Sequence, residues 1–454
     1  MIFPPILKKL TFIYCRKDGG NDETLYLQRN FQSMQSKKLI QNTLKSTILL
    51  ILVFVGFTSI NGQTLFNIEG PDGQIYQLNG GASGEFINTI TTAVPLLMIS
   101  PDARAGALGD AGGGLSPDAN SIHWNPAKLA NIEGKSGVSL SYIPWLRQLV
   151  PDINLGYLSW YKQLKKRQTI GGSLRYFSLG NIVFTDQLGN TTGQFNPNEF
   201  AIDLAYARRF SDRWSGGLAL RFIYSNLTGG IDVLGTPSFP GTSVAADIST
   251  YYTNPDVKVG GKKSTYSFGV TASNLGAKIS YTKSADRDFI PMNLRISNSL
   301  KMKVDDYNAF TFLFDMNKLL VPTPPIRVDG EIIAGKENNV GIVSGILQSF
   351  ADAPGVPQSD GSLNVLQEEI REINFCGGVE YMYNNLFAIR TGYFHEHATK
   401  GNRRYFTLGA GLKFNVFTID LAYLIPTQQR NPLENTLRFT LQFDFGAFQN
   451  QDKE

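Results

Sequence analysis

Apolar and polar residues alternate with a period of two through most of the chain after residue 135. In one such stretch, Ile202 and Leu204 flank Asp203. Because successive side chains of a strand point to opposite faces, this period predicts strands with one apolar face and one polar or small face. The clearest alternating segments are 200–207, 218–224, 310–315, 405–414, 417–423 and 437–445.

This alternation fits either a soluble β-sandwich or a membrane barrel, which differ in what the apolar face contacts. The segments are about ten residues long, which is the length that crosses a bilayer at a tilt. The opposite face is rich in Gly, Ala, Thr, Asn and Asp, as a polar lumen requires. Aromatic residues recur near the predicted strand ends, where they would form girdles at the membrane interface. These aromatic residues are Tyr157, Trp160, Tyr161, Phe210, Trp214, Tyr393 and Phe394.

The number of alternating segments sets the size of the barrel. Between residues 136 and 446 we count about 13 or 14 strands, and the last of them, rich in Phe, is typical of a barrel-closing strand. Bacterial barrels have an even number of strands. After residue 62 there is no apolar run of the roughly 18 residues that a spanning helix needs. We therefore predict an all-β protein: a transmembrane antiparallel β-barrel of about 14 strands over residues 136–446.

Charge is unevenly distributed along the chain. Charged residues make up 18% of the 454 residues, compared with about 25% in typical soluble domains. Residues 1–62 hold eight basic and three acidic side chains, which leaves 34 basic and 35 acidic side chains in the remainder. The net charge of +4 therefore belongs to the N-terminus, and it gives no reason to expect a nucleic-acid partner.

The N-terminal region indicates export. The apolar run Ile48–Phe57 follows three lysines and precedes small residues, which is typical of a secretory signal peptide. We assign residues 34–62 to this signal and residues 1–33 to a start-site extension. Residues 63–92 are predicted to be a flexible N-terminal tail, and residues 447–454 a C-terminal tail. Cys376 is then the only cysteine of the exported chain, so no internal disulfide is expected.

Three further regions lie inside or between the predicted strands. Residues 93–135 contain two Ser-Pro-Asp-Ala boxes, whose Ser and Asp side chains can cap short helices. Small residues there allow close packing, so we predict a helical plug, with an ordinary linker as the alternative. Residues 229–263 and 318–368 are predicted to be long loops that face outward and carry partner contacts. A short amphipathic helix is expected at 339–350.

Catalytic and metal-binding motifs are not evident. The chain has three histidines, and His395-Glu396-His397 would place two ligands on one face of a strand. A third ligand is not apparent, so we expect a solvated loop there rather than a metal site. The sequence has no G-x-S-x-G, P-loop or H-E-x-x-H motif. We predict no catalytic residues, no cofactor and no enzymatic activity.

The segment 93–130, AVPLLMISPDARAGALGDAGGGLSPDANSIHWNPAKLA, resembles the N-terminal signature of the PorV (LptO) family. Its members are outer-membrane components of the type IX secretion system. The box at 125–127 also resembles that of the wider FadL-like family, whose barrels have 14 strands and an N-terminal plug. The resemblance implies that a set of residues holds the plug in the barrel, with an ion pair between Arg104 and an Asp. These residues are Asp102, Arg104, Gly106, Asp110, Asp118, His123, Trp124, Asn125 and Pro126.

The same resemblance implies a non-enzymatic function in the outer membrane of a Gram-negative bacterium. Such a protein binds the C-terminal β-domain of secreted cargo and shuttles it from the translocon to an attachment complex. The implied partners are cargo C-terminal β-domains, a sortase-like attachment-complex protein, a giant translocon barrel, and the lipid bilayer with its lipopolysaccharide. Two alternatives remain. One is a FadL-like transporter of hydrophobic small molecules. The other is a lipid A-modifying enzyme, which needs a nucleophile beside a base.

Overall fold

The computed structural model describes residues 65–69, 75–79, 87–146, 150, 152–185, 191–230, 237–283, 287–358, 361–428 and 431–445. The predicted start-site extension (1–33), signal peptide (34–62) and C-terminal tail (447–454) lie outside these residues. None of the helices in the described part of the chain combines the length and the apolar character needed to cross a membrane.

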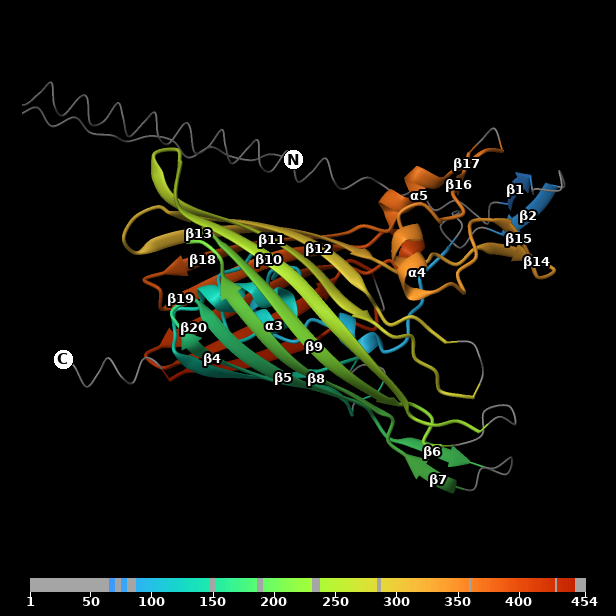
Figure 1. Ribbon diagram of the computed structural model, residues 1–454, viewed down its shortest axis with the longest axis horizontal. Helices are drawn as coiled ribbons and strands as arrows, with labels where there is room; N and C mark the ends of the chain where they lie inside the picture. Colours follow the sequence, from blue (N-terminus) through green and yellow to red (C-terminus); the bar gives the residue numbers. More distant parts are fainter. Residues whose placement is uncertain are drawn as a thin grey trace, which may run out of the picture. The chain divides into compact units, whose positions relative to one another are not determined.

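Fourteen antiparallel strands form a closed barrel, which confirms the predicted fold class (Figure 1). Each strand pairs with the next barrel strand along the chain, and the last strand pairs with the first, with Leu441 opposite Leu140. The strands are β3 (Ser136–Pro144), β4 (Ile153–Lys165), β5 (Gln168–Leu179), β8 (Asn198–Arg209), β9 (Trp214–Asn226), β10 (Gly241–Val259), β11 (Lys262–Gly276), β12 (Asn293–Lys303), β13 (Asn308–Leu319), β18 (Asn374–Tyr383), β19 (Phe387–His395), β20 (Arg404–Phe414), β21 (Phe417–Pro426) and β22 (Leu437–Asp444).

The alternation in the sequence separates the two faces of this barrel. In β8, Leu204 is 60% exposed on the outer face, whereas the neighbouring Asp203 is buried in the lumen. The outer face is therefore the apolar surface that meets lipid. Among the predicted girdle aromatics, Trp160, Phe210 and Trp214 are exposed and Tyr393 is half-buried. The prediction is wrong for three others that stand at inward positions of their strands and are buried in the lumen: Tyr157, Tyr161 and Phe394.

The two ends of the barrel differ in the length of their connections. At one end, β10 and β11 are joined by two residues and β20 and β21 by two residues. At the other end, long connections leave the barrel, including 180–197, 277–292 and 320–373. In outer-membrane barrels the short turns face the periplasm and the long loops face outward. We therefore call the end with the long connections the outer end.

The predicted loop at 229–263 is wrong for most of its length. Strand β10 fills Gly241–Val259, so the connection covers only residues 227–240. The strand still alternates, with Val244 and Ile248 exposed outward and Asp247 buried inward. Its Ser, Thr and Ala residues conceal this period in the sequence, because the outer face carries few large apolar side chains.

The second predicted loop, 318–368, corresponds to a connection between β13 and β18 at residues 320–373, which we call the insert. The predicted helix at 339–350 is confirmed as α4. The insert and a hairpin between β5 and β8 lie at the outer end (Figure 1). Their elements are β6 (Ile182–Thr185), β7 (Thr191–Phe195), β14 (Ile326–Val328), β15 (Glu331–Ala334), α4 (Ile342–Gln348), β16 (Val356–Pro357), β17 (Leu363–Asn364) and α5 (Val365–Arg371).

The predicted flexible tail at 63–92 contains regular structure. Strands β1 (Leu65–Glu69) and β2 (Ile75–Asn79) pair antiparallel. The residues between them include Pro71-Asp72-Gly73, a composition typical of turns. Two short strands joined by turn-forming residues give a hairpin where the polar, Gly-rich composition predicts no structure.

Candidate functional site

An inner segment, residues 94–132, lies against the inward faces of the barrel strands (Figure 1). It contains four short helices that leave many backbone N–H groups without partners inside the segment. The helices are η1 (Pro95–Met98), α2 (Ala103–Gly106), α3 (Ser121–Trp124) and η2 (Pro126–Asn131).

Inward side chains of the strands accept these backbone hydrogen bonds. The N–H groups of Gly112 and Gly113 donate to Oδ2 of Asp315 on β13, at 3.0 and 2.9 Å. The Gly109 N–H donates to Thr407 Oγ1 at 2.9 Å. The Ala103 N–H donates to Thr440 Oγ1 at 2.8 Å. Since an unsatisfied buried N–H is costly, the barrel wall fixes the position of the segment through its backbone.

Close approach also depends on glycines at one point of contact. Gly109 has φ +69°, which favours glycine. A Cβ at Gly378 on β18 would lie 2.6 to 2.8 Å from atoms of Leu108. A Cβ at Gly392 on β19 would collide with the backbone of Leu108 and Gly109. Backbone therefore packs directly on backbone here.

Asp102 joins the first two α-helices of the inner segment. Its side chain caps α2 by accepting a hydrogen bond from the Ala105 N–H at 2.9 Å. Its second oxygen accepts the indole N–H of Trp124. The guanidinium of Arg295 stacks on the Trp124 ring, 4.5 Å from the centroid. This stack links α3 to strand β12.

The predicted ion pair of Arg104 is present. Its Nη1 lies 3.1 Å from Asp118 Oδ2, and its Nε lies 3.5 Å from Glu380 on β18. Asp110 instead binds the barrel wall, because it accepts hydrogen bonds from the Tyr405 hydroxyl and from Arg438. These acids and bases are all paired, so they anchor the segment rather than present reactive groups.

The remaining predicted residues of the segment also make structural contacts. His123 Nδ1 lies 2.8 Å from Arg175 Nη2. Asn125 caps η2 by accepting from the Ala127 N–H, and its amide donates to the Thr250 carbonyl. Pro126 occupies the first turn of η2. Gly106 faces the side chain of Arg438, which leaves no space for a Cβ.

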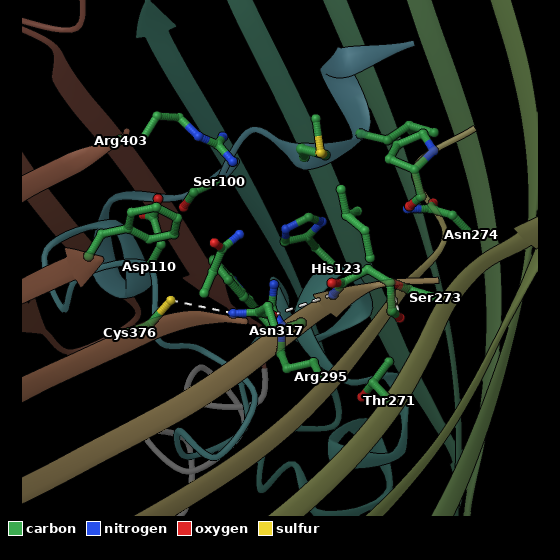
Figure 2. A pocket seen from close by; sticks show the side chains of 18 of the residues that line it. Ser100, Asp110, His123, Thr271, Ser273, Asn274, Arg295, Asn317, Cys376 and Arg403 are labelled. Atoms are coloured by element: carbon green, nitrogen blue, oxygen red, sulfur yellow. Dashed lines mark hydrogen bonds between the residues drawn. The ribbon is translucent and has the colours of Figure 1, made fainter. Parts of the chain in front are cut away.

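A polar pocket lies in the lumen beside the inner segment (Figure 2). The Cys376 thiol in its wall accepts a hydrogen bond from the Asn317 amide at 3.4 Å. The pocket combines amides, hydroxyls and guanidinium groups with apolar side chains such as Leu97, Trp124 and Phe394. Its labelled lining residues are Ser100, Asp110, His123, Thr271, Ser273, Asn274, Arg295, Asn317, Cys376 and Arg403.

A second group of charged residues attaches the insert to the barrel, and we call it the outer ion cluster. Lys318, at the end of β13, lies 2.9 Å from Glu369 and 2.7 Å from Glu372. Lys400, in the connection between β19 and β20, lies 2.5 Å from Glu368 and 3.0 Å from Glu372. All five side chains are buried. Three glutamates of the α5 region are therefore held by two lysines from separate parts of the barrel mouth.

Asp352 adds a fourth carboxylate to this outer ion cluster. One of its oxygens accepts the Thr323 N–H, and the other has no hydrogen-bond partner among the described residues. Burial, together with the charges of Glu369 and Glu372, raises the pKa of Asp352 to about 7. The carboxyl group of Asp352 thus holds a proton more readily when the insert is seated than in water.

The outer surface of the insert is apolar. On α4, Val343 and Leu347 are each 71% exposed. On α5, Leu366 is 70% and Ile370 54% exposed, whereas Glu368 on the same helix is buried. An amphipathic surface helix normally turns its apolar stripe inward and its charges outward. The α5 helix has the reverse arrangement, and exposed apolar surface of this kind marks a site of protein interaction.

The His395-Glu396-His397 sequence lies at the outer end of β19. Glu396 accepts hydrogen bonds from the Arg403 guanidinium at 2.7 and 2.9 Å. The His397 ring accepts the Thr399 N–H at the start of η3 (Ala398–Lys400). Within the described ranges, no three His, Cys, Asp or Glu side chains converge as metal ligands would.

The sequence alone did not identify the outer ion cluster or the barrel partners of the inner segment. The acidic residues Glu368, Glu369 and Glu372 are spaced as on one side of a helix, which is the one signal that was available. Nothing in the sequence connects them with Lys318 and Lys400, because those residues meet only at the barrel mouth.

The chain is similar to known proteins in sequence and in fold. Over residues 83–326, more than half of the chain, the sequence matches the family described as Type IX secretion system protein PorV. The search of curated proteins gives no significant match.

Solved structures similar to this chain include two outer-membrane barrels. The toluene transporter TodX of Pseudomonas putida is 10% identical, with 79% of this chain and 99% of that chain covered and a TM-score of 0.40. A FadL homologue of Pseudomonas aeruginosa is 12% identical, with 79% and 100% covered and a TM-score of 0.38. Similarities at this level carry no argument about function.

Proposed function

This chain belongs to the PorV family of type IX secretion system proteins, and from that premise we propose that it binds the C-terminal β-domain of secreted cargo and shuttles it to the attachment complex. Membership of the family makes the chain an outer-membrane component of this secretion system in a Gram-negative bacterium. The family is a secretion component rather than a family of enzymes. The partners proposed are the cargo domains, the translocon barrel and the sortase-like protein.

The observation that carries the proposal is the reversed polarity of the insert. Leu347 and Leu366 face solvent at the outer end, while the glutamates of α5 are buried against the barrel mouth. A binding surface for a folded protein domain needs exposed apolar side chains on a support that is held rigidly. The outer ion cluster supplies that support. Cargo that arrives outside the membrane would meet this surface first.

The lumen bears on the alternative of a transporter for hydrophobic molecules. A carrier for such molecules needs a mainly apolar pocket. The pocket beside the inner segment sets the polar groups of Asn274, Arg295 and Asn317 among its apolar side chains, which favours binding at the surface over transport. The inner segment is tied to the wall through Asp315 and Thr407, and we propose that it works as a plug.

Binding of the cargo domain tests the proposal. The protein with a C-terminal tag is extracted from outer membranes in mild detergent and titrated with a purified cargo C-terminal β-domain. Substitution Leu366→Glu, alone and with Leu347→Glu, is expected to weaken binding by about tenfold or more, as for an apolar hot spot. Tyr307→Glu is the matched control, since Tyr307 is an exposed large side chain in a short turn at the opposite end.

Two results would contradict the proposal. The first is equal binding by the wild type, the insert variants and the Tyr307 control, with all of them folded. The second is purification of the barrel without secretion partners but with bound fatty acid or lipid, which would support a transporter instead.

A further inference from the structure

The residues directly before the inner segment lie at the outer end of the barrel. The Asn88 N–H donates to the carbonyl of Thr399 at 3.0 Å, in the connection between β19 and β20. The Ala93 N–H donates to the carbonyl of Phe289 at 2.9 Å, in the connection 277–292. Both connections belong to the outer end. Residues 88–93 are therefore held among the outward-facing loops by their own backbone.

Asn88 also binds the insert through its side chain. Its Nδ2 donates to the Pro324 carbonyl and to Glu368 Oε1, each at 3.1 Å, and Asn88 is buried. The same Glu368 oxygen is 2.5 Å from Lys400 Nζ. A residue near the start of the exported chain is thus part of the outer ion cluster. It joins a segment 280 residues away in the sequence.

The chain then crosses the lumen to the opposite end. Near the end of the inner segment, the Ala130 carbonyl accepts a hydrogen bond from Arg209, beside the short turn 210–213. The Lys135 carbonyl accepts one from the Gln163 N–H, next to the two-residue turn between β4 and β5. Strand β3 starts there. The chain therefore runs from the outer end to the short-turn end before the first barrel strand.

Strands β1 and β2 precede this crossing, and β1 contacts β16 of the insert. We infer that β1, β2 and residues 87–93, which together we call the N-terminal strap, are displayed on the outer face of the membrane, and that the strap clamps the insert through Asn88. This assignment rests on the topology of the chain and stands whether or not cargo is the partner.

Accessibility on intact cells tests the display. A short epitope is inserted between Glu69 and Ile75, and the same epitope is placed in the short turn 304–307 as the matched control. We expect an antibody to label the first protein on intact cells and the second only after the outer membrane has been permeabilised. Loss of heat-modifiable migration in gels identifies any variant that fails to fold. Labelling of a folded strap variant only after permeabilisation would overturn the inference.

Proteolysis tests the clamp. In the purified, folded protein, Asn88→Ala removes two hydrogen bonds to the insert. We expect cleavage within the insert to accelerate about tenfold, because the free energy of local opening falls when buried hydrogen bonds are lost. Cleavage of the β6–β7 hairpin is the internal control and should not change. Equal cleavage of the insert in Asn88→Ala and wild type would overturn the clamp.

Discussion

The inner segment and the insert are both attached to the barrel through buried charged side chains, but they differ in where their apolar side chains lie. In the inner segment, Arg104 and Asp110 reach from the segment to the wall around it, and apolar residues such as Leu108 are buried as well. In the insert, the charges of Glu368 and Glu372 face the barrel, and several apolar residues of α4 and α5 face solvent. One region lies inside the barrel, while the other is attached to the barrel mouth.

This difference shows what each region is suited to do. Most residues of the inner segment are buried and tied to the wall, so they stabilise the barrel. An attached module with an apolar outer surface exposes the kind of surface that binds proteins. The signature motifs of the sequence lie in the first region, yet the surface that we propose for partners lies in the second. The motif residues therefore make the contacts that hold the inner segment, and the partner surface that we propose lies outside the motifs.

The largest effect is expected from Lys400→Met, which leaves Glu368 and Glu372 without one of their cations. Breaking a buried ion pair by removing one partner costs about 3–5 kcal/mol, because the remaining charge stays buried. The insert should then open locally while the barrel stays folded, which hydrogen exchange of the insert measures. Lys336→Met, at an exposed lysine of the insert, is the control. Equal protection of the insert in both variants would contradict the assigned role of the outer ion cluster.

A smaller effect is expected where the inner segment meets the wall. In Gly378→Ala the new Cβ meets Leu108, whereas in Gly377→Ala on the same strand the nearest atom is 3.8 Å away. Overpacking of this kind costs about 1–3 kcal/mol. The temperature at which heat-modifiable migration is lost should fall for Gly378→Ala only. In planar bilayers the same variant should show greater conductance if the segment is a plug. A similar decrease for both variants would argue against tight packing.

The attachment of the insert should also depend on pH. Since the pKa of Asp352 is raised to about 7 when the insert is seated, the seated state binds a proton that the open state releases above about pH 4. Stability of the seated insert therefore falls as pH rises from about 4 to 7 and levels off above that. Proteolysis of the insert should accelerate over this range, after correction for the protease. Asp352→Asn should flatten the profile, and an unchanged profile would exclude Asp352 as the cause.

The smallest effect on stability is expected on the outer surface of the insert. Leu366→Ser replaces a side chain that is already exposed, so the unfolding free energy should change by no more than about 0.5 kcal/mol. Cargo binding by the same variant should nevertheless weaken. Thermal denaturation and binding, measured on one preparation, separate the two effects. A large loss of stability would mean that Leu366 packs against another part of the chain and is not free for a partner.

The barrel could be predicted from the sequence because period two is a local property of each strand. The local alternation is enough to assign Leu204 to the outer face and Asp203 to the lumen, whatever the neighbouring strands are. The period is weaker in β10, where small residues such as Thr242 and Ala246 take outward positions on a strand that is just as well paired. The girdle prediction failed for Tyr157, because an aromatic near a strand end belongs to either face and only its position in the alternation decides which.

The contacts of the inner segment were predictable only where both partners lie close together in the sequence. Arg104 follows the first Ser-Pro-Asp-Ala box and Asp118 lies in the second, 14 residues further on, and the family resemblance implied an ion pair of Arg104 with an Asp. Asp110 and Arg438 are 328 residues apart. Their contact depends on the stagger of all 14 strands at closure, which no local pattern encodes. The same holds for Lys400 and Glu368 in the outer ion cluster.

The junction between the last strand and the first has a consequence for the order of biogenesis. The ring is complete only when β22 pairs with β3, whereas the inner segment directly precedes β3 and is synthesised before every barrel strand. With the β1–β2 hairpin beyond the outer end, a ring that closed early would have to be threaded by a folded hairpin. Laying the segment into an open sheet and joining β22 to β3 last needs no such threading. We therefore expect the pairing of these two strands to be the final step of assembly, after the inner segment has already packed on the open sheet.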